Sequence, residues 1–266
     1  MRKFKQDNYT SIIFDSINEV VKYNRGTERT PRYKKYHVSD GMGKGYEEFT
    51  STSSYEEAED LLLHGWEVGT LDLIKSLKSP SGALKRQICN TYSVAGYQPC
   101  VPRYLQGLPD SMIDHKVVTI KSKIVNIVKD IGYAGYVKAE TMENESLKVL
   151  KLVQSLESKG YRVNLYISFV SDVPYTSKKL NMQIKIKDSG QKLNIKQVAF
   201  PLVHPSMFRR IVFGLIERLE ETKNFGNGYG KCTEYAEVKH LFKGNIYIPR
   251  IVDEEVIVDI NKYMVK

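Results

Sequence analysis

The stretch from residue 116 to residue 169 constrains the fold of this chain more than any other part of the sequence. It opens with KVVTIKSKIVNIVKDI, whose valine and isoleucine content predicts one or two β-strands. A helix is expected next, at 144–160, with Gly160 in the position of a C-terminal cap. YRVNLYISF, at 161–169, predicts another strand. A strand, a helix and a strand with short joints form a β-α-β unit, which favours a parallel pair with a right-handed crossover.

We therefore predict an α/β fold with a central, partly parallel sheet and flanking helices. LNMQIKIKD, at 180–188, adds a strand in which Lys185 and Lys187 lie opposite an apolar face, and this pattern favours an edge strand. The tail at 244–264 predicts one or two further strands.

The N-terminal part is expected to be separate. Residues 1–45 are predicted to form an N-terminal helix and a basic arm, and residues 46–266 the α/β domain. The helix is placed at 8–23, where apolar residues recur at helical spacing. Within the domain, 79–114 is rich in turn formers, so we expect an irregular segment there, with a single helical turn that ends at Gly107.

Another helix is expected to begin near residue 53. Ser53 with Glu56, or Ser54 with Glu57, has the spacing of a capping box, and Gly65 is a suitable end.

Composition is that of a globular protein, with 266 residues, 41% of them hydrophobic and 27% charged. Three widely spaced cysteines predict reduced thiols in a cytosolic protein. No apolar run approaches the length of a membrane span and the N-terminus lacks a signal-peptide core, so no membrane partner is expected. The net charge of +9 favours polyanionic partners.

The segment FPLVHPSMFRRIVFGLIERLEE, at 200–221, predicts a core helix whose first turns carry two arginines. One hypothesis is an anion site, in which His204, Ser206, Arg209, Arg210 and free backbone N–H groups hold a phosphate or a carboxylate. The alternative is structural: Arg210 is solvated, Arg209 pairs with a distant acidic residue, and His204 makes a satisfied contact.

The arm offers a second candidate surface, which interleaves cations with aromatic rings. Its residues are Arg32, Tyr33, Lys34, Lys35 and Tyr36. Phosphate attraction and base stacking would suit a single-stranded nucleic acid. The same composition also suits a solvated loop or an arm that contacts protein.

Catalytic and metal motifs are absent from the sequence, which has no Cys-x-x-Cys, His-Glu-x-x-His or Gly-x-Ser-x-Gly pattern. A weak alternative joins the strand-end carboxylates Asp130, Asp172 and Asp188 to His204, as a site for a divalent cation that hydrolyses phosphoesters. Carboxylates at strand ends are also ordinary turn residues. We expect no cofactor and no bound metal.

Several motifs carry a resemblance. SYEEAEDLLLHGW, CVPRYLQGLPDSMID, SLESKGYRVNLY and FPLVHPSMFRRIVFGLIE, with GYGK after them, resemble an uncharacterised family of tailed-bacteriophage proteins over residues 46–231. The resemblance implies a viral protein in the host cytoplasm or in the virion, and no particular activity.

The element order from 124 to 187 is similar to the first half of a von Willebrand A-like fold, one of several Rossmann-like arrangements. The position of that fold's metal motif reads DIGYA: Asp130 is kept, but Gly132 and Ala134 replace the two serines. Metal-dependent adhesion is therefore not expected.

Together these patterns favour a non-enzymatic binding protein that acts through a basic surface on nucleic acid or on an acidic protein. One alternative is a virion or host-protein interaction component without nucleic-acid binding. The other is a metal-dependent phosphoesterase or nuclease that uses Asp130, Asp188 and His204. The oligomeric state stays open.

Overall fold

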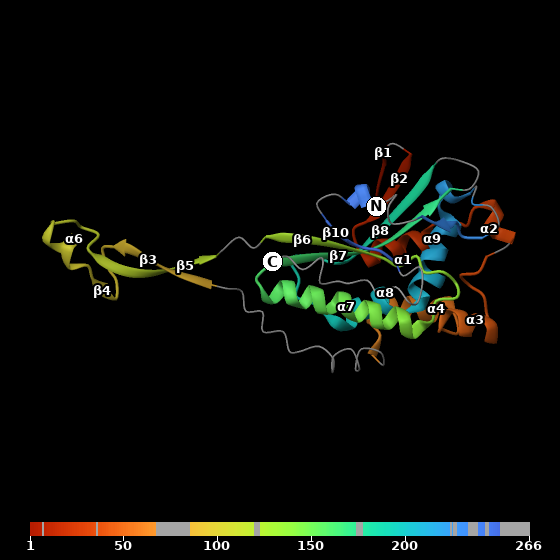
Figure 1. Ribbon diagram of the computed structural model, residues 1–266, viewed down its shortest axis with the longest axis horizontal. Coiled ribbons are helices and arrows are strands. Elements are labelled where there is room, and N and C mark those ends of the chain that lie inside the picture. Colours follow the sequence, from red (N-terminus) through yellow and green to blue (C-terminus); the bar gives the residue numbers. More distant parts are fainter. Residues whose placement is uncertain are drawn as a thin grey trace.

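The structure is a computed structural model of the whole chain. It describes residues 1–6, 8–35, 37–67, 86–119, 123–173, 178–223, 225, 228–233, 239–242 and 245–250. The fold is mixed α/β, with one main sheet flanked by helices and a separate three-stranded sheet (Figure 1). The predicted fold class is therefore confirmed.

The main sheet has the strand order β1-β2-β8-β7-β6-β10, and the short strand β9 pairs with β7. Its strands are β1 (Arg2–Gln6), β2 (Tyr9–Phe14), β6 (Ile124–Asp130), β7 (Arg162–Asp172), β8 (Lys179–Lys187), β9 (Lys231–Cys232) and β10 (Ile246–Ile248). The predicted β-α-β unit is present, because β6 and β7 are parallel and helix α7 (Ala139–Ser158) joins them. β10 is also parallel to β6, so three neighbouring strands end at the same edge of the sheet.

β8 is not an edge strand, contrary to the prediction. It lies between β2, to which it is parallel, and β7, to which it is antiparallel. Lys187 is buried rather than solvated, and its Nζ donates to the carbonyl oxygens of Val163 and Gln191 and pairs with Glu157 at 2.5 Å. A lysine on a polar face is therefore compatible with a central strand when carbonyls and a carboxylate meet its ammonium group.

The helix predicted at 8–23 is wrong in its first half. Residues 9–14 form β2, and helix α1 (Ile17–Gly26) starts only after Ser16, whose Oγ accepts from the N–H of Glu19 at 3.3 Å. Because β2 belongs to the main sheet, residues 1–45 are not a unit separate from the α/β domain. A short run of apolar residues fits a strand or a helix equally well, and pairing with β8 decides it here.

The remaining helices of the main body pack around the sheet. They are α2 (Pro31–Lys35), α3 (Lys44–Thr50), α4 (Tyr55–His64), α8 (Ile195–Val203), η1 (Met207–Val212), α9 (Phe213–Arg218), η2 (Glu220–Thr222) and η3 (Lys239–Phe242). α4 begins as expected at the Ser54 cap, whose Oγ accepts from the N–H of Glu57, and it ends at Gly65. The main core is formed by buried side chains of the sheet and of helices α1, α7, α8 and α9. A smaller cluster around Val128, Val170 and Phe242 covers the other face of the sheet.

The segment predicted to be irregular, 79–114, contributes to a second sheet. β3 (Arg86–Ser93), β5 (Met112–Thr119) and β4 (Gln98–Pro99) form an antiparallel ribbon, with the short helix α6 (Val101–Leu105) at its tip. Figure 1 shows this ribbon projecting far from the main body. The expected helical turn is confirmed, and Gly107 follows it with φ +71°. The last residues of β5 lie in the stretch 116–131, where one or two strands were predicted. β3 and the start of β5 were not predicted, because β3 pairs with the far end of the segment rather than with an adjacent hairpin partner.

Candidate ligand pocket

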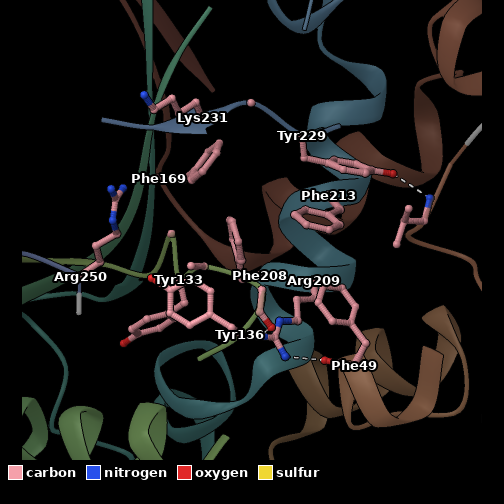
Figure 2. Close-up of a pocket in the computed structure, with 15 residues that line it drawn as sticks. Phe49, Tyr133, Tyr136, Phe169, Phe208, Arg209, Phe213, Tyr229, Lys231 and Arg250 are labelled. Carbon is pink, nitrogen blue, oxygen red and sulfur yellow. Dashed lines mark hydrogen bonds between the residues drawn. The ribbon is translucent and has the colours of Figure 1, made fainter. Parts of the chain in front are cut away.

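A pocket of about 610 Å³ lies at the carboxyl ends of the parallel strands. The loop after β6, the end of β7 and Arg250 after β10 form one side of it. Helices η1 and α9 and the segment 229–231 form the other (Figure 2). Side chains just beyond the carboxyl ends of parallel strands are where α/β proteins usually hold ligands. The volume also falls within the range of about 300–1,000 Å³ that is typical of small-molecule sites.

The helical segment that lines one side of the pocket begins with a π-helical turn. Residues 207–212 form a π-helix, and the N–H of Phe213 donates to the carbonyl of Phe208, five residues earlier. This wider turn brings Phe208 and Phe213 to the same face, with ring centroids 5.2 Å apart. π-helical turns are rare and occur frequently at functional sites. In a regular α-helix the two rings would point in different directions.

Aromatic rings make up most of the wall. Figure 2 shows the rings of Tyr133, Phe169, Phe208 and Phe213 around a common hollow. Phe213 is stacked on Tyr229, with ring centroids 3.9 Å apart and planes inclined by 10°. Such faces can stack on a planar ring of a ligand.

Tyr229 is held by a buried carboxylate. Its hydroxyl donates to Glu217 at 2.6 Å and accepts from the N–H of Val38 at 2.7 Å. Glu217 is fully buried and also accepts from Arg29, from both the N–H and the hydroxyl of Ser39, and from the N–H of Val38. Burial and the charge of Glu217 raise the pKa of Tyr229, so its phenol stays neutral. This network fixes the pocket wall and ties residues 29–39 to α9.

Gly230 also lines the pocket, and only glycine fits there. Its φ of +91° disfavours any side chain, and a Cβ atom would lie 2.1 Å from the hydroxyl oxygen of Ser171.

Arg209 is the buried cation of the pocket. Its side chain is 5% exposed and lies over the ring of Phe49, with the guanidinium carbon 4.3 Å from the ring centroid. It donates to three backbone carbonyl oxygens, those of Phe49, Gly135 and Val137, at 2.6, 3.3 and 3.2 Å. Its Nε–H has no acceptor among the described residues. Burial lowers the pKa of Arg209 to about 10, so the group is still a cation at neutral pH.

Two more cations, Lys231 and Arg250, line the pocket, and none of the lining residues in the described chain is acidic. Two buried carboxylates lie behind lining residues: Glu217, which accepts from Tyr229, and Asp130, which accepts from the N–H of Gly132 at 2.8 Å and from the hydroxyl of Tyr247 at 2.9 Å. Burial raises the pKa of Asp130, which favours its neutral form, while the charge of Arg250 acts in the opposite direction.

The anion site predicted at the start of the helix does not form. Ser206 and Arg210 are fully buried, and His204 is 7% exposed. Arg210 makes five contacts inside the protein, to Thr50 Oγ1, Thr52 Oγ1 and the carbonyls of Ser39, Gly41 and Thr52. The structural alternative was also wrong for both arginines, because Arg210 is not solvated and Arg209 has no acidic partner among the described residues. It is confirmed for His204, whose ring stacks on Phe200 and whose Nδ1 accepts from the N–H of Ser206.

The nucleic-acid-binding surface predicted on the arm does not form as expected. Tyr33 is 1% exposed and donates its hydroxyl to the carbonyl of Gly228, so it cannot stack on a base. Lys34 pairs with Glu28 at 2.5 Å. Arg32 and Lys35 lie at the surface, and Tyr36 lies outside the described residues. The segment predicted to be a basic arm folds against α9 through Arg29 and Glu217 instead of extending from the body.

The carboxylates of the phosphoesterase alternative are not brought together. Asp130 pairs in register with Ser168, whereas Asp188 follows Lys187, which is opposite Leu165 and therefore toward the other end of β7. His204 faces Trp66 and Phe200. No cluster of three metal-ligating side chains occurs within the ranges that the structure describes.

The ribbon tip is a second surface of note. Seven of the thirteen large hydrophobic side chains that are exposed in the described chain lie between residues 92 and 108, which makes the tip the main exposed apolar region. They are Tyr92, Val94, Tyr97, Val101, Tyr104, Leu105 and Leu108. The charged residues from 92 to 113 are Arg103 and Asp110, which pair with each other at 2.6 Å. Arg103 also lies over the ring of Tyr92, so the tip is ordered by its own contacts.

These features define a mixed α/β protein with an aromatic pocket at the carboxyl ends of its parallel strands. The chain belongs to the family described as Domain of unknown function (DUF7192), which matches residues 3–264. No curated protein and no solved structure matches it. The von Willebrand A-like arrangement and the tailed-bacteriophage origin stay predictions from the sequence. Among the described residues, no helix is long and apolar enough to cross a membrane.

Proposed function

We propose that this chain is a binding protein that holds a small organic molecule with a planar ring in the pocket beside Phe208 and Phe213. The observation that carries the proposal is the aromatic pocket itself, placed where three parallel strands end. It has room for a ligand of ordinary metabolite size, at about 610 Å³.

Binding is favoured over catalysis by the side chains on the wall. The lining residues within the described chain include no histidine, cysteine, serine or carboxylate. General acid–base and nucleophilic catalysis most often use such groups, within hydrogen-bond reach of one another. Of the residue types that can also serve, the lining holds Lys231 and the tyrosines Tyr133, Tyr136 and Tyr229. The same composition disfavours the metal-dependent phosphoesterase.

The test uses 2-naphthamide, a neutral planar probe, and a variant that fills the pocket. Gly135 lines the pocket, and a Cβ atom there would meet only the ring of Phe49, at 3.8 Å, so the position accepts a side chain and Gly135→Leu is the variant chosen to occupy the pocket. Calorimetry should detect binding to the wild type and its loss in Gly135→Leu. Gly45→Leu, at an exposed position with nothing within 4 Å, is the matched control and should bind normally. Equal binding by all three proteins would refute the pocket as the site.

The ribbon favours a second candidate function, association with another copy of this chain. A net charge of +9 opposes the close approach of two bodies. The tip carries one positive and one negative charge and projects away from the body, so two copies can meet there with little repulsion. Exposed apolar patches of this kind usually mark interaction sites.

Nucleic-acid binding is the weaker proposal. The observations that support it are the net charge of +9 and the surface cations Arg32, Lys34 and Lys35. Of these, Lys34 is already paired with Glu28. The resemblance to tailed-bacteriophage proteins supports a viral setting for the binding function, in the host cytoplasm or in the particle.

A further inference from the structure

We infer that the ligand of the aromatic pocket is an organic anion whose carboxylate or phosphate oxygens meet Arg209. This inference rests on the proposed ligand-binding function and adds the charge of the ligand to it.

The first observation is that Arg209 is buried without a counter-ion. Arg218, further along at the end of α9, lies 3.8 Å from Glu217, a carboxylate that also pairs with Arg29 at 2.8 Å. Arg210 makes no carboxylate contact within the described chain either, but the charges of Glu57 and Asp40 partly oppose the effect of burial on its pKa, whereas burial alone acts on the pKa of Arg209. No carboxylate of the described residues pairs with Arg209, and its three acceptors are neutral carbonyls. A buried cation without a counter-ion is unfavourable, and an anion in the pocket would supply the missing charge.

The second observation is an unused donor. The Nε–H of Arg209 is buried and lacks an acceptor within the described chain, whereas both terminal nitrogens donate to carbonyls. Buried donors without partners are rare in folded proteins, and each needs an explanation. An oxygen of a bound carboxylate or phosphate would accept this hydrogen bond.

The guanidinium is also held in place before any ligand binds. Carbonyls from two different segments, at Phe49 and at Gly135 and Val137, fix its plane, and the Phe49 ring covers one face. A cation that is already oriented loses little conformational entropy when an anion arrives. It is therefore arranged as a fixed recognition group rather than as a mobile surface charge.

The charge and the shape of the rest of the pocket also suit a ring-bearing anion. Lys231 and Arg250 add positive charge, and no carboxylate is among the described lining residues, although Arg250 also interacts electrostatically with the buried Asp130. The aromatic wall suits the ring of the ligand, and Arg209 suits its charged end. The ligand class is therefore a ring-bearing organic anion.

The test compares three probes of nearly the same shape: 2-naphthoate, 2-naphthyl phosphate and neutral 2-naphthamide. Calorimetry on the full chain should show at least one anion binding about tenfold or more tightly than the amide. The relative affinity of the two anions then distinguishes a carboxylate site from a phosphate site.

Variants assign the preference to Arg209. Arg209→Gln should remove the preference for the anion while it still binds 2-naphthamide, and Arg209→Lys should retain part of the preference. Arg103→Gln, on the ribbon, is the control arginine and should leave all affinities unchanged. If Arg209→Gln fails to fold, the comparison of anion and amide on the wild type and on Arg209→Lys still decides the matter.

The outcomes separate the two proposals. If the amide binds as tightly as both anions, the inference is wrong and the pocket function stands. If the anion preference persists in Arg209→Gln, Arg209 is not the recognition group and the inference is also wrong. If no probe binds at millimolar concentration, the proposed function fails together with the inference.

Discussion

Arg209 and Arg210 are adjacent in the chain, yet their guanidinium groups lie in different surroundings. Arg210 is fully buried, and each of its nitrogens donates to a hydroxyl or carbonyl of residues 39–52. Arg209 turns to the pocket wall and keeps one buried N–H without an acceptor among the described residues. Both side chains are buried because other segments cover the π-helical turn at 207–212: residues 39–52 accept from Arg210, and Phe49, Gly135 and Val137 accept from Arg209. One arginine therefore supports the fold, and the other lines the pocket.

The first prediction concerns this division. Arg210→Gln should lower the free energy of unfolding by about 3 kcal/mol or more, because several buried acceptors lose their donor. Arg209→Gln should cost about 1–2 kcal/mol, since loss of its carbonyl contacts is offset by removal of a buried charge that lacks a counter-ion. Urea unfolding of both variants measures the difference. A larger loss for Arg209→Gln would contradict the assignment.

The second prediction tests the network under the pocket wall. Glu217→Gln should lower the free energy of unfolding by roughly 2–4 kcal/mol, because Arg29 then keeps only the partly exposed Asp40 as a counter-ion among the described residues, and the buried donors around residue 217 lose a charged acceptor. Glu220→Gln is the matched control: its side chain is 74% exposed, so the change should stay within about 0.5 kcal/mol. Chemical unfolding of the two variants is the measurement. Similar losses would show that the network contributes little.

The third prediction concerns pH. Burial lowers the pKa of His204 from 6.5 to about 4, so the unfolded chain takes up a proton at a pH where the folded chain does not. The contribution of this group to stability is therefore present above pH 6.5 and is lost as the pH falls toward 4, by roughly 3 kcal/mol in total.

Asparagine can place an acceptor near the position of Nδ1, so the test variant is His204→Asn. The wild type should lose more unfolding free energy than His204→Asn between pH 7 and pH 4.5, by roughly 2 kcal/mol. His64, whose side chain is 72% exposed, is the control position, and His64→Asn should follow the wild type. Parallel curves for all three proteins would show that His204 is not the responsible group.

The fourth prediction concerns the ribbon. If the tip joins two copies, sedimentation velocity should show a dimer whose population grows with concentration, and the double substitution Tyr104→Ser and Leu105→Ser should leave a monomer. These side chains are 71% and 78% exposed, so their replacement should not disturb the fold. Met42→Ser, at a residue that is 69% exposed and lies away from the ribbon, should keep the dimer. A wild type that is monomeric at every concentration would exclude self-association.

Much of the fold was predictable where the signal is local. Valine and isoleucine content, helical periodicity and the caps at Ser54, Gly65 and Gly160 located α4, α7 and the strands on either side of α7. Elements whose identity depends on distant partners were missed. β2 is a strand because it pairs with β8, and β3 because it pairs with β5.

The site was harder to predict than the fold. Arg209 was predicted as part of an anion site from its unusual place in a helix, but its burial beside an aromatic pocket was not predicted, because the exposed side of a helix is expected from 3.6 residues per turn and a π-helical turn breaks that period. Phe213, Tyr229 and the loop at 131–136 were not predicted as site residues. The Gly-Tyr pairs at 132–133 and 135–136, directly after a buried strand, were the signal that could have drawn attention to the pocket.

The central claim, that the pocket holds a ring-bearing anion at Arg209, is tested most directly by a crystal structure of the protein with 2-naphthoate. The account predicts the naphthalene ring among Phe208, Phe213 and Tyr133, with a carboxylate oxygen about 3 Å from Nε of Arg209. An empty pocket in crystals soaked at saturating probe, or a probe bound with its carboxylate away from Arg209, would contradict it.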